Sequence, residues 1–198
     1  TMVQSASIAM NPKNGGITAV VGGRGKHVFR GFNRSTQMRR QPGSTIKPIV
    51  VYTPALEHGY FYDSTLQDKK QSYGTNNYTP KNYDDTYSGT VPMYKALYES
   101  LNAPAVWLLN KIGVNRGYDM AKKFGLPVEK GDKNLALALG GMTRGVSPQQ
   151  MARAYAVFAN DGLMPSPHYI TKIEDASGKV IAKNDGSKNK RIISGKTA

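Results

Sequence analysis

The two residues whose types and spacing are best suited to chemistry are Ser44 and Lys47, within Ser44-Thr45-Ile46-Lys47. On a helix, side chains three residues apart lie on the same face, one turn from each other. A serine is a weak nucleophile until a base takes its proton, and a lysine can be that base if burial or nearby positive charge lowers its pKa. A helix N-terminus also stabilises the negative charge that develops on attack. Most matches to this spacing are ordinary helix starts, but the preceding Arg40-Gln41-Pro42-Gly43 and the following Pro48 make this one far less ordinary.

A second candidate is Ser100-Leu101-Asn102, between two predicted helices. Its hydroxyl would relay protons, and its carboxamide would orient a substrate amide. By themselves, these residues favour a plainer alternative, in which the helix breaks here and Asn102 is the N-cap of the following helix.

A third stretch, Gly195-Lys196-Thr197, suggests a phosphate-binding loop. That motif needs a glycine five residues before Gly195, where this chain has Lys190, and no buried strand leads into it. We therefore predict no phosphate loop here.

Composition excludes several kinds of site. The chain has 198 residues, 39% of them hydrophobic, so it suits one domain or most of one. Without cysteine it has no disulfide, no thiolate metal site and no cysteine nucleophile. Its histidines, at positions 27, 58 and 168, match no metal-ligand spacing. No apolar run reaches the roughly 18 residues of a membrane span, and no signal peptide opens the chain. The chain starts within a strand-like pattern, so we expect a piece of a longer protein.

The net charge of +14 is compatible with nucleic acid, an anionic membrane or an anionic polymer as a partner. The excess is concentrated in residues 24–40 and 183–196. We expect a solvated basic surface, with a nucleic-acid partner as the alternative.

The pattern of apolar residues and turn signals predicts strands, then a block of helices, then strands again, which is typical of a sheet with a helical insertion. We expect hairpins at 3–23 and 169–183, a loop or irregular strand at 25–41, a long loop at 61–92, and helices at 44–60, 92–100, 103–112, 116–124 and from 147 onward.

Several stretches, in this order, resemble the transpeptidase domain of class A penicillin-binding proteins, which also carry a glycosyltransferase domain. They are Asn11-Pro12 with Gly15 to Gly23, Arg40 to Pro48, Pro80 with Asn82-Tyr83, Ser100 to Val106, Leu137 to Gly141, and Gly145 to Ala156.

The resemblance implies an α/β (α+β) fold like that of penicillin-binding proteins and serine β-lactamases, with an antiparallel sheet flanked by helices and a mostly helical lobe. We expect residues 1–198 to be an incomplete transpeptidase domain: first strands and lead-in at 1–43, the helical lobe with the active-site motifs at 44–162, and a returning segment at 163–198. The family's third motif, Lys-Thr-Gly, lies farther along than Lys196-Thr197, so we expect that motif and the final strands beyond this chain.

The resemblance also implies roles. Ser44 attacks the carbonyl of the penultimate D-Ala of a peptidoglycan stem peptide, and Lys47 is the general base for that step. Ser100 passes a proton to the leaving amine, and Asn102 bonds the substrate amide. An amine of a neighbouring stem peptide then resolves the acyl-enzyme into a cross-link. β-Lactam antibiotics acylate Ser44, and neither a metal nor an organic cofactor is implied.

The partners expected from the resemblance are stem peptides, β-lactams and a companion chain or C-terminal segment carrying Lys-Thr-Gly. The location is the extracellular face of the cytoplasmic membrane, reached through an N-terminal anchor that this chain lacks, and no nucleic acid takes part. Two alternatives stay open: a D,D-carboxypeptidase or β-lactamase-like hydrolase, and a non-enzymatic binding module for an anionic polymer.

Overall fold

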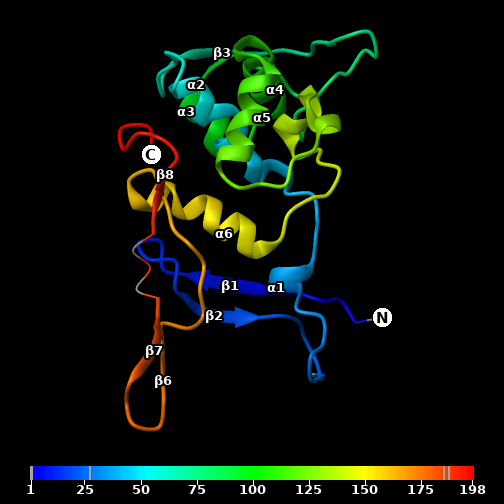
Figure 1. Ribbon diagram of the computed structural model, residues 1–198. Helices are drawn as coiled ribbons and strands as arrows, with labels where there is room; N and C mark the ends of the chain where they lie inside the picture. The colour runs from blue at the N-terminus through cyan, green and yellow to red at the C-terminus, as the bar shows by residue number, and fades with distance from the viewer. Residues whose placement is uncertain (1, 27, 185, 187) are drawn as a thin grey trace. The chain divides into compact units, whose positions relative to one another are not determined.

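A computed structural model describes residues 2–26, 28–184, 186 and 188–198 (Figure 1). The chain divides into two compact units. The first comprises residues 1–40, 124–126 and 146–198, and the second comprises 41–123 and 127–145. The helical unit thus ends at residue 145, whereas we expected a helical lobe over 44–162.

The strands of the first unit pair as antiparallel hairpins and ribbons. β1 (Ser7–Met10) pairs with β2 (Ile17–Val21), with Ser7 opposite Val21. This confirms the first predicted hairpin, although its first strand begins at Ser7 instead of Val3. The second predicted hairpin is also confirmed, since β6 (Lys172–Glu174) pairs with β7 (Val180–Lys183). A further short ladder joins β5 (Leu163–Met164) to β8 (Lys190–Arg191).

Helices cover the first hairpin. α1 (Arg34–Gln37) lies in a stretch that we predicted to be loop or strand, and that prediction is wrong. Asn33 caps this helix, and the buried Ser35 hydroxyl lies 2.8 Å from Ser7 O and 2.7 Å from Val21 O, so α1 is tied to both strands. α6 (Pro148–Ala156) follows its N-cap Ser147, which agrees with the helix predicted from 147 onward, and Ser147 and Gln150 form a capping box. A 3-10 turn, η5 (Phe158–Asn160), follows α6.

In the second unit, the helix predicted over 44–60 is three short pieces: the 3-10 turn η1 (Gly43–Ile46), the π-helical turn η2 (Pro48–Tyr52) and α2 (Thr53–Leu56). Pro48 explains the break, because it has no N–H to donate back to Ser44. The Ser44 carbonyl instead accepts from Lys47 N, and the Pro48 carbonyl accepts from Thr53 N.

The stretch predicted as a long loop over 61–92 contains two paired strands, so that prediction is wrong in part. β3 (Thr65–Asp68) and β4 (Gly89–Pro92) are antiparallel. β3 packs beside α4 (Asn102–Ile112), most of whose apolar residues are buried. The remaining helices of this unit are α3 (Met93–Tyr98), α5 (Val114–Lys123), η3 (Lys130–Asp132) and η4 (Leu135–Leu139).

The mixture of helices and strands agrees with the expected fold class. Within the described residues the strands form four two-stranded antiparallel pairs. Gly195, Lys196 and Thr197 lie in a turn, where Thr197 N donates to Ser194 O. This agrees with our expectation that Lys196-Thr197 is not the strand motif.

Candidate active site

Ser44 lies in η1 with an exposed side chain, and the helical unit braces the backbone just before it. Gly43 has φ +58°, and Gly140, at the end of η4, has φ +87°. A Cβ on Gly140 would collide with the backbone N, Cα and O of Gly43. The collision requires glycine at position 140, the positive φ favours glycine at position 43, and η4 holds the turn that presents Ser44.

Lys47 lies one turn from Ser44, but its side chain is only 1% exposed. Its Nζ donates to Ser100 O at 2.6 Å, Asn102 Oδ1 at 2.7 Å and Leu101 O at 3.0 Å. A fourth oxygen, Ser100 Oγ, lies at 3.3 Å. The lysine of the first motif is thus held by all three residues of the second motif.

Burial lowers the pKa of Lys47 from 10.5 to about 8, because an ammonium group is poorly solvated there. At pH 7.5 a pKa of about 8 leaves roughly a quarter of the amine neutral, against about one part in a thousand at the ordinary value. A neutral amine can accept a proton, so Lys47 has the property that a general base needs.

Ser100 occupies a tight turn between α3 and α4. Its φ of +54° is uncommon for a residue with a side chain. The turn is closed by two hydrogen bonds, from Ser100 N to Leu97 O and from Leu101 N to Ala96 O. This conformation directs the carbonyls of Ser100 and Leu101 toward Lys47. Backbone strain of the kind found at Ser100 often occurs at functional sites.

Asn102 is the first residue of α4, and Leu101 is the N-cap, so the alternative that Asn102 caps this helix is wrong. Its Oδ1 accepts from Lys47, and its Nδ2 donates to Lys81 O at 2.8 Å. Its backbone N donates to Asn82 Oδ1 at 2.9 Å.

The structure therefore brings Lys47, Ser100 and Asn102 into direct contact. Ser44 stands apart: among the described residues its hydroxyl makes no hydrogen bond, so none joins it to Lys47. Lys81 and Asn82 also contact the site, and they were not among the predicted site residues. The only signal for them was their place in the stretch around Pro80 and Tyr83 that resembles the family.

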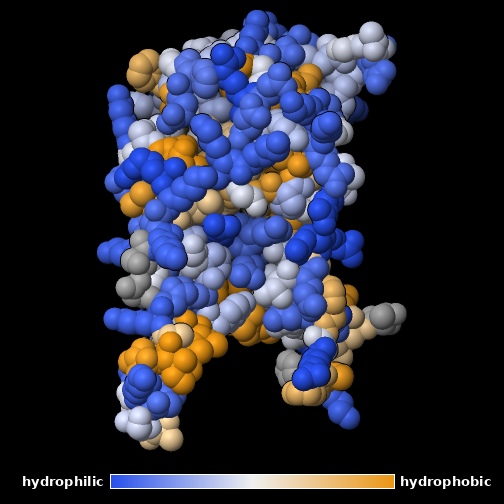
Figure 2. All heavy atoms as spheres, in the orientation of Figure 1, coloured by the Kyte–Doolittle hydropathy of each residue, from blue (hydrophilic) through white to orange (hydrophobic). Residues whose placement is uncertain are grey.

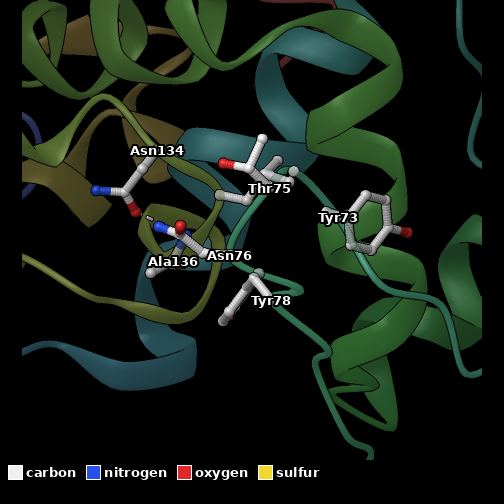
Figure 3. Close-up of a pocket in the computed structure, with 8 residues that line it drawn as sticks. Tyr73, Thr75, Asn76, Tyr78, Asn134 and Ala136 are labelled. Carbon is white, nitrogen blue, oxygen red and sulfur yellow. Dashed lines mark hydrogen bonds between the residues drawn. The ribbon is translucent and has the colours of Figure 1, made fainter.

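A separate cavity of about 420 Å³ opens in the same unit (Figure 3). The figure shows Thr75 and Asn76 of one turn beside Asn134 and Ala136, where Ala136 N donates to Asn134 Oδ1 at the start of η4. None of the four predicted site residues lines this cavity. It is lined by Tyr73, Gly74, Thr75, Asn76, Tyr78, Asn134, Leu135 and Ala136.

In the part of the chain that the structure describes, no group of three or more His, Cys, Asp or Glu side chains is placed to hold a metal ion. His27, one of the three histidines considered above, lies outside the described residues. No helix among those described has both the length and the apolar character to cross a membrane.

Residues 6–198 match the family model described as the penicillin binding protein transpeptidase domain. The chain belongs to this family. Penicillin-binding protein 2a of Streptococcus pneumoniae serotype 2 is 48% identical over 197 residues, which cover 98% of this chain and 26% of the relative. The chain thus spans about a quarter of that relative's length, and it corresponds to the N-terminal part of the transpeptidase domain.

Solved structures agree. Penicillin-binding protein 1A from Haemophilus influenzae has a TM-score of 0.79 and 36% identity, with 91% of this chain and 27% of that chain covered. PonA1 from Mycobacterium tuberculosis, in complex with penicillin V, has a TM-score of 0.82 and 25% identity, with 98% of this chain and 54% of that chain covered.

Proposed function

We propose that this chain carries the acylation machinery of a peptidoglycan D,D-transpeptidase, with Ser44 as the nucleophile. One observation carries the proposal: a buried lysine with a lowered pKa lies one turn from an exposed serine and bonds all three residues of a Ser-x-Asn motif. The family of the chain supports it.

In the proposed reaction, Ser44 Oγ forms a bond to the carbonyl carbon of the penultimate D-Ala, and its proton goes to neutral Lys47. The bond to the terminal D-Ala breaks, Ser100 gives a proton to the leaving amine, and Lys47 returns the proton it took to Ser100. Asn102 bonds the substrate amide. The Ser44 ester is then attacked by the amine of a second stem peptide, which restores the Ser44 hydroxyl and forms the cross-link.

The absence of a hydrogen bond between Ser44 and Lys47 is compatible with this sequence of steps. Catalytic hydrogen bonds are often long or poorly aligned without substrate and tighten only in the complex. The contact from Nζ to Ser100 Oγ, at 3.3 Å, is the longest of the four and the easiest to exchange for Ser44.

β-Lactams would acylate the same serine, and the similar PonA1 has been solved in complex with penicillin V. We also propose that the two units are parts of one transpeptidase domain, with the Lys-Thr-Gly motif in a segment outside this chain. The intact protein would act at the outer face of the cytoplasmic membrane, where its substrate lies.

The test is labelling of the full-length protein with a fluorescent penicillin, followed by trypsin digestion. Trypsin does not cut before proline, so Ser44 falls in the peptide 41–69, which also contains Ser64. We expect the label on this peptide in the native protein and in Ser64→Ala, but not in Ser44→Ala. Undiminished labelling of Ser44→Ala would overturn the assignment.

A further inference from the structure

The carboxamide of Asn82 is buried beside the site, with an exposed fraction of 4%, and every one of its hydrogen-bonding positions is used. Its oxygen accepts from Asn102 N at 2.9 Å and Ala103 N at 3.0 Å. Its nitrogen donates to Asp68 Oδ1 at 2.7 Å and to Thr86 O at 2.9 Å.

This oxygen satisfies the first two N–H groups of α4, which have no partner within the helix. The N-cap residue itself, Leu101, has an apolar side chain that cannot accept a hydrogen bond from these N–H groups. Asn82 therefore performs the function of an N-cap from a distant part of the chain, and it fixes the helix end that carries Asn102.

Asp68 determines which way round the Asn82 amide lies. This carboxylate is 1% exposed, and it accepts from Asn82 Nδ2 and, at 2.8 Å, from Ser88 N. A carboxylate has only acceptors, so it must face the NH₂ of Asn82, and the amide oxygen must then face α4.

A chain of contacts thus runs from Asp68 through Asn82 and Asn102 to the amine of Lys47. We propose that Asn82 is a positioning residue of the active site, oriented by Asp68, which holds Asn102 and through it the Lys47 amine. This rests on the proposed function, since it concerns the rate at which Ser44 is acylated.

A single substitution at Asn82 or Asp68 is expected to break the contact between them, whereas the two substitutions together are expected to restore it. Asn82→Asp places a carboxylate against the carboxylate of Asp68. Asp68→Asn places an NH₂ group against the NH₂ group of Asn82. Combined, the two substitutions exchange the roles of the two positions. The amide now at position 68 accepts from Ser88 N and donates to the carboxylate now at position 82, which accepts from the N–H groups of α4. Only Thr86 O then loses its partner, so the double variant is expected to regain function.

The experiment measures penicillin acylation of the full-length protein over time, which yields a rate constant and a labelled fraction. Asn82→Ala and Asn82→Asp should each lower the rate constant 10-fold or more, and adding Asp68→Asn to Asn82→Asp should recover at least a third of that loss on a logarithmic scale. Asn110→Ala, the same exchange at an exposed position of α4, is the matched control and should leave the rate constant within twofold of the native value.

A purely structural role would instead lower the labelled fraction and leave the rate constant of the labelled molecules unchanged. A lowered labelled fraction with an unchanged rate constant in Asn82→Ala would overturn the proposal. An acylation rate constant in the double variant no higher than in Asn82→Asp would also overturn it. If Asn82→Ala does not fold, the comparison of Asn82→Asp with the double variant decides. Failure of the native protein to label at all would instead refute the proposed function.

Discussion

Burial gives Lys47 a pKa of about 8, which is close to the pH range in which a general base works best near neutrality. The cost of burying the amine is met by three close oxygen atoms, from Ser100, Leu101 and Asn102. Those oxygens favour the charged form, whereas desolvation favours the neutral form and prevails, since the pKa falls to about 8.

This predicts how the rate of acylation depends on pH. If neutral Lys47 accepts the Ser44 proton, the rate constant rises about tenfold per pH unit at low pH, because the neutral fraction does, and levels off above about pH 8. Stopped-flow acylation with a penicillin between pH 5.5 and 9.5 measures it. A rate that does not change over this range would contradict Lys47 as the base.

The same shift predicts the dependence of stability on pH. In the unfolded chain Lys47 keeps its ordinary pKa of 10.5. Between pH 8 and 10.5 this group is therefore mostly protonated in the unfolded state and mostly neutral in the folded state. The contribution of this group to the free energy of unfolding therefore rises with pH over that interval. Comparison of the native protein with Lys47→Met in urea titrations at pH 7.5 and 9.5 measures it: the stability difference should change with pH, and a constant difference would contradict the lowered pKa.

At the scale of elements, the site depends on close backbone contact between two short helical turns, η1 and η4. η4 ends against Gly43, immediately before Ser44. Because the contact is between two backbones, it cannot be relieved by rotating a side chain.

We therefore expect Gly140→Ala to impair acylation 10-fold or more and to destabilise the protein by about 1–3 kcal/mol, through strain at φ +87° and collision with Gly43. Gly178→Ala is the matched control, since Gly178 has φ +85° but open space around its Cα. The control bears the same backbone strain without the collision. Thermal unfolding and the acylation rate measure both, and equal effects of the two variants would contradict the role of η4.

Elements that depend on local signals could be predicted from the sequence, and those that depend on distant contacts could not. The hairpins and α6 have turn and capping residues beside them. β3 pairs with β4 across 20 intervening residues, and its buried positions, Leu66 and Asp68, do not form an apolar pattern. For the same reason motif spacing identified Ser44 and Lys47, whereas Asn82 is recognisable only from its contacts with Asp68 and α4.

For the whole molecule, the stability comes from buried apolar side chains and not from charge. The ion pairs between described residues join side chains that are at least 39% exposed, and such pairs contribute about 0–1 kcal/mol each. All four predicted site residues belong to one unit, residues 41–123 and 127–145. The hairpin β6–β7 belongs to the other unit and exposes hydrophobic residues, which Figure 2 shows at its surface.

The exposed face of that hairpin predicts a change in solubility without a change in activity. Ile170, Ile173, Val180 and Ile181 are 45–66% exposed, and apolar edge strands of this kind favour association between molecules. Ile181→Lys should lower light scattering at high protein concentration and alter the free energy of unfolding by no more than about 0.5 kcal/mol, as surface substitutions generally do. The acylation rate of Ser44 should stay the same, because the hairpin contributes no residue to the site. By contrast, Ile46→Ala, at a fully buried position beside Lys47, should lower the free energy of unfolding by about 2–5 kcal/mol. A large loss of stability in Ile181→Lys would show that the hairpin face is packed against another part of the full-length protein.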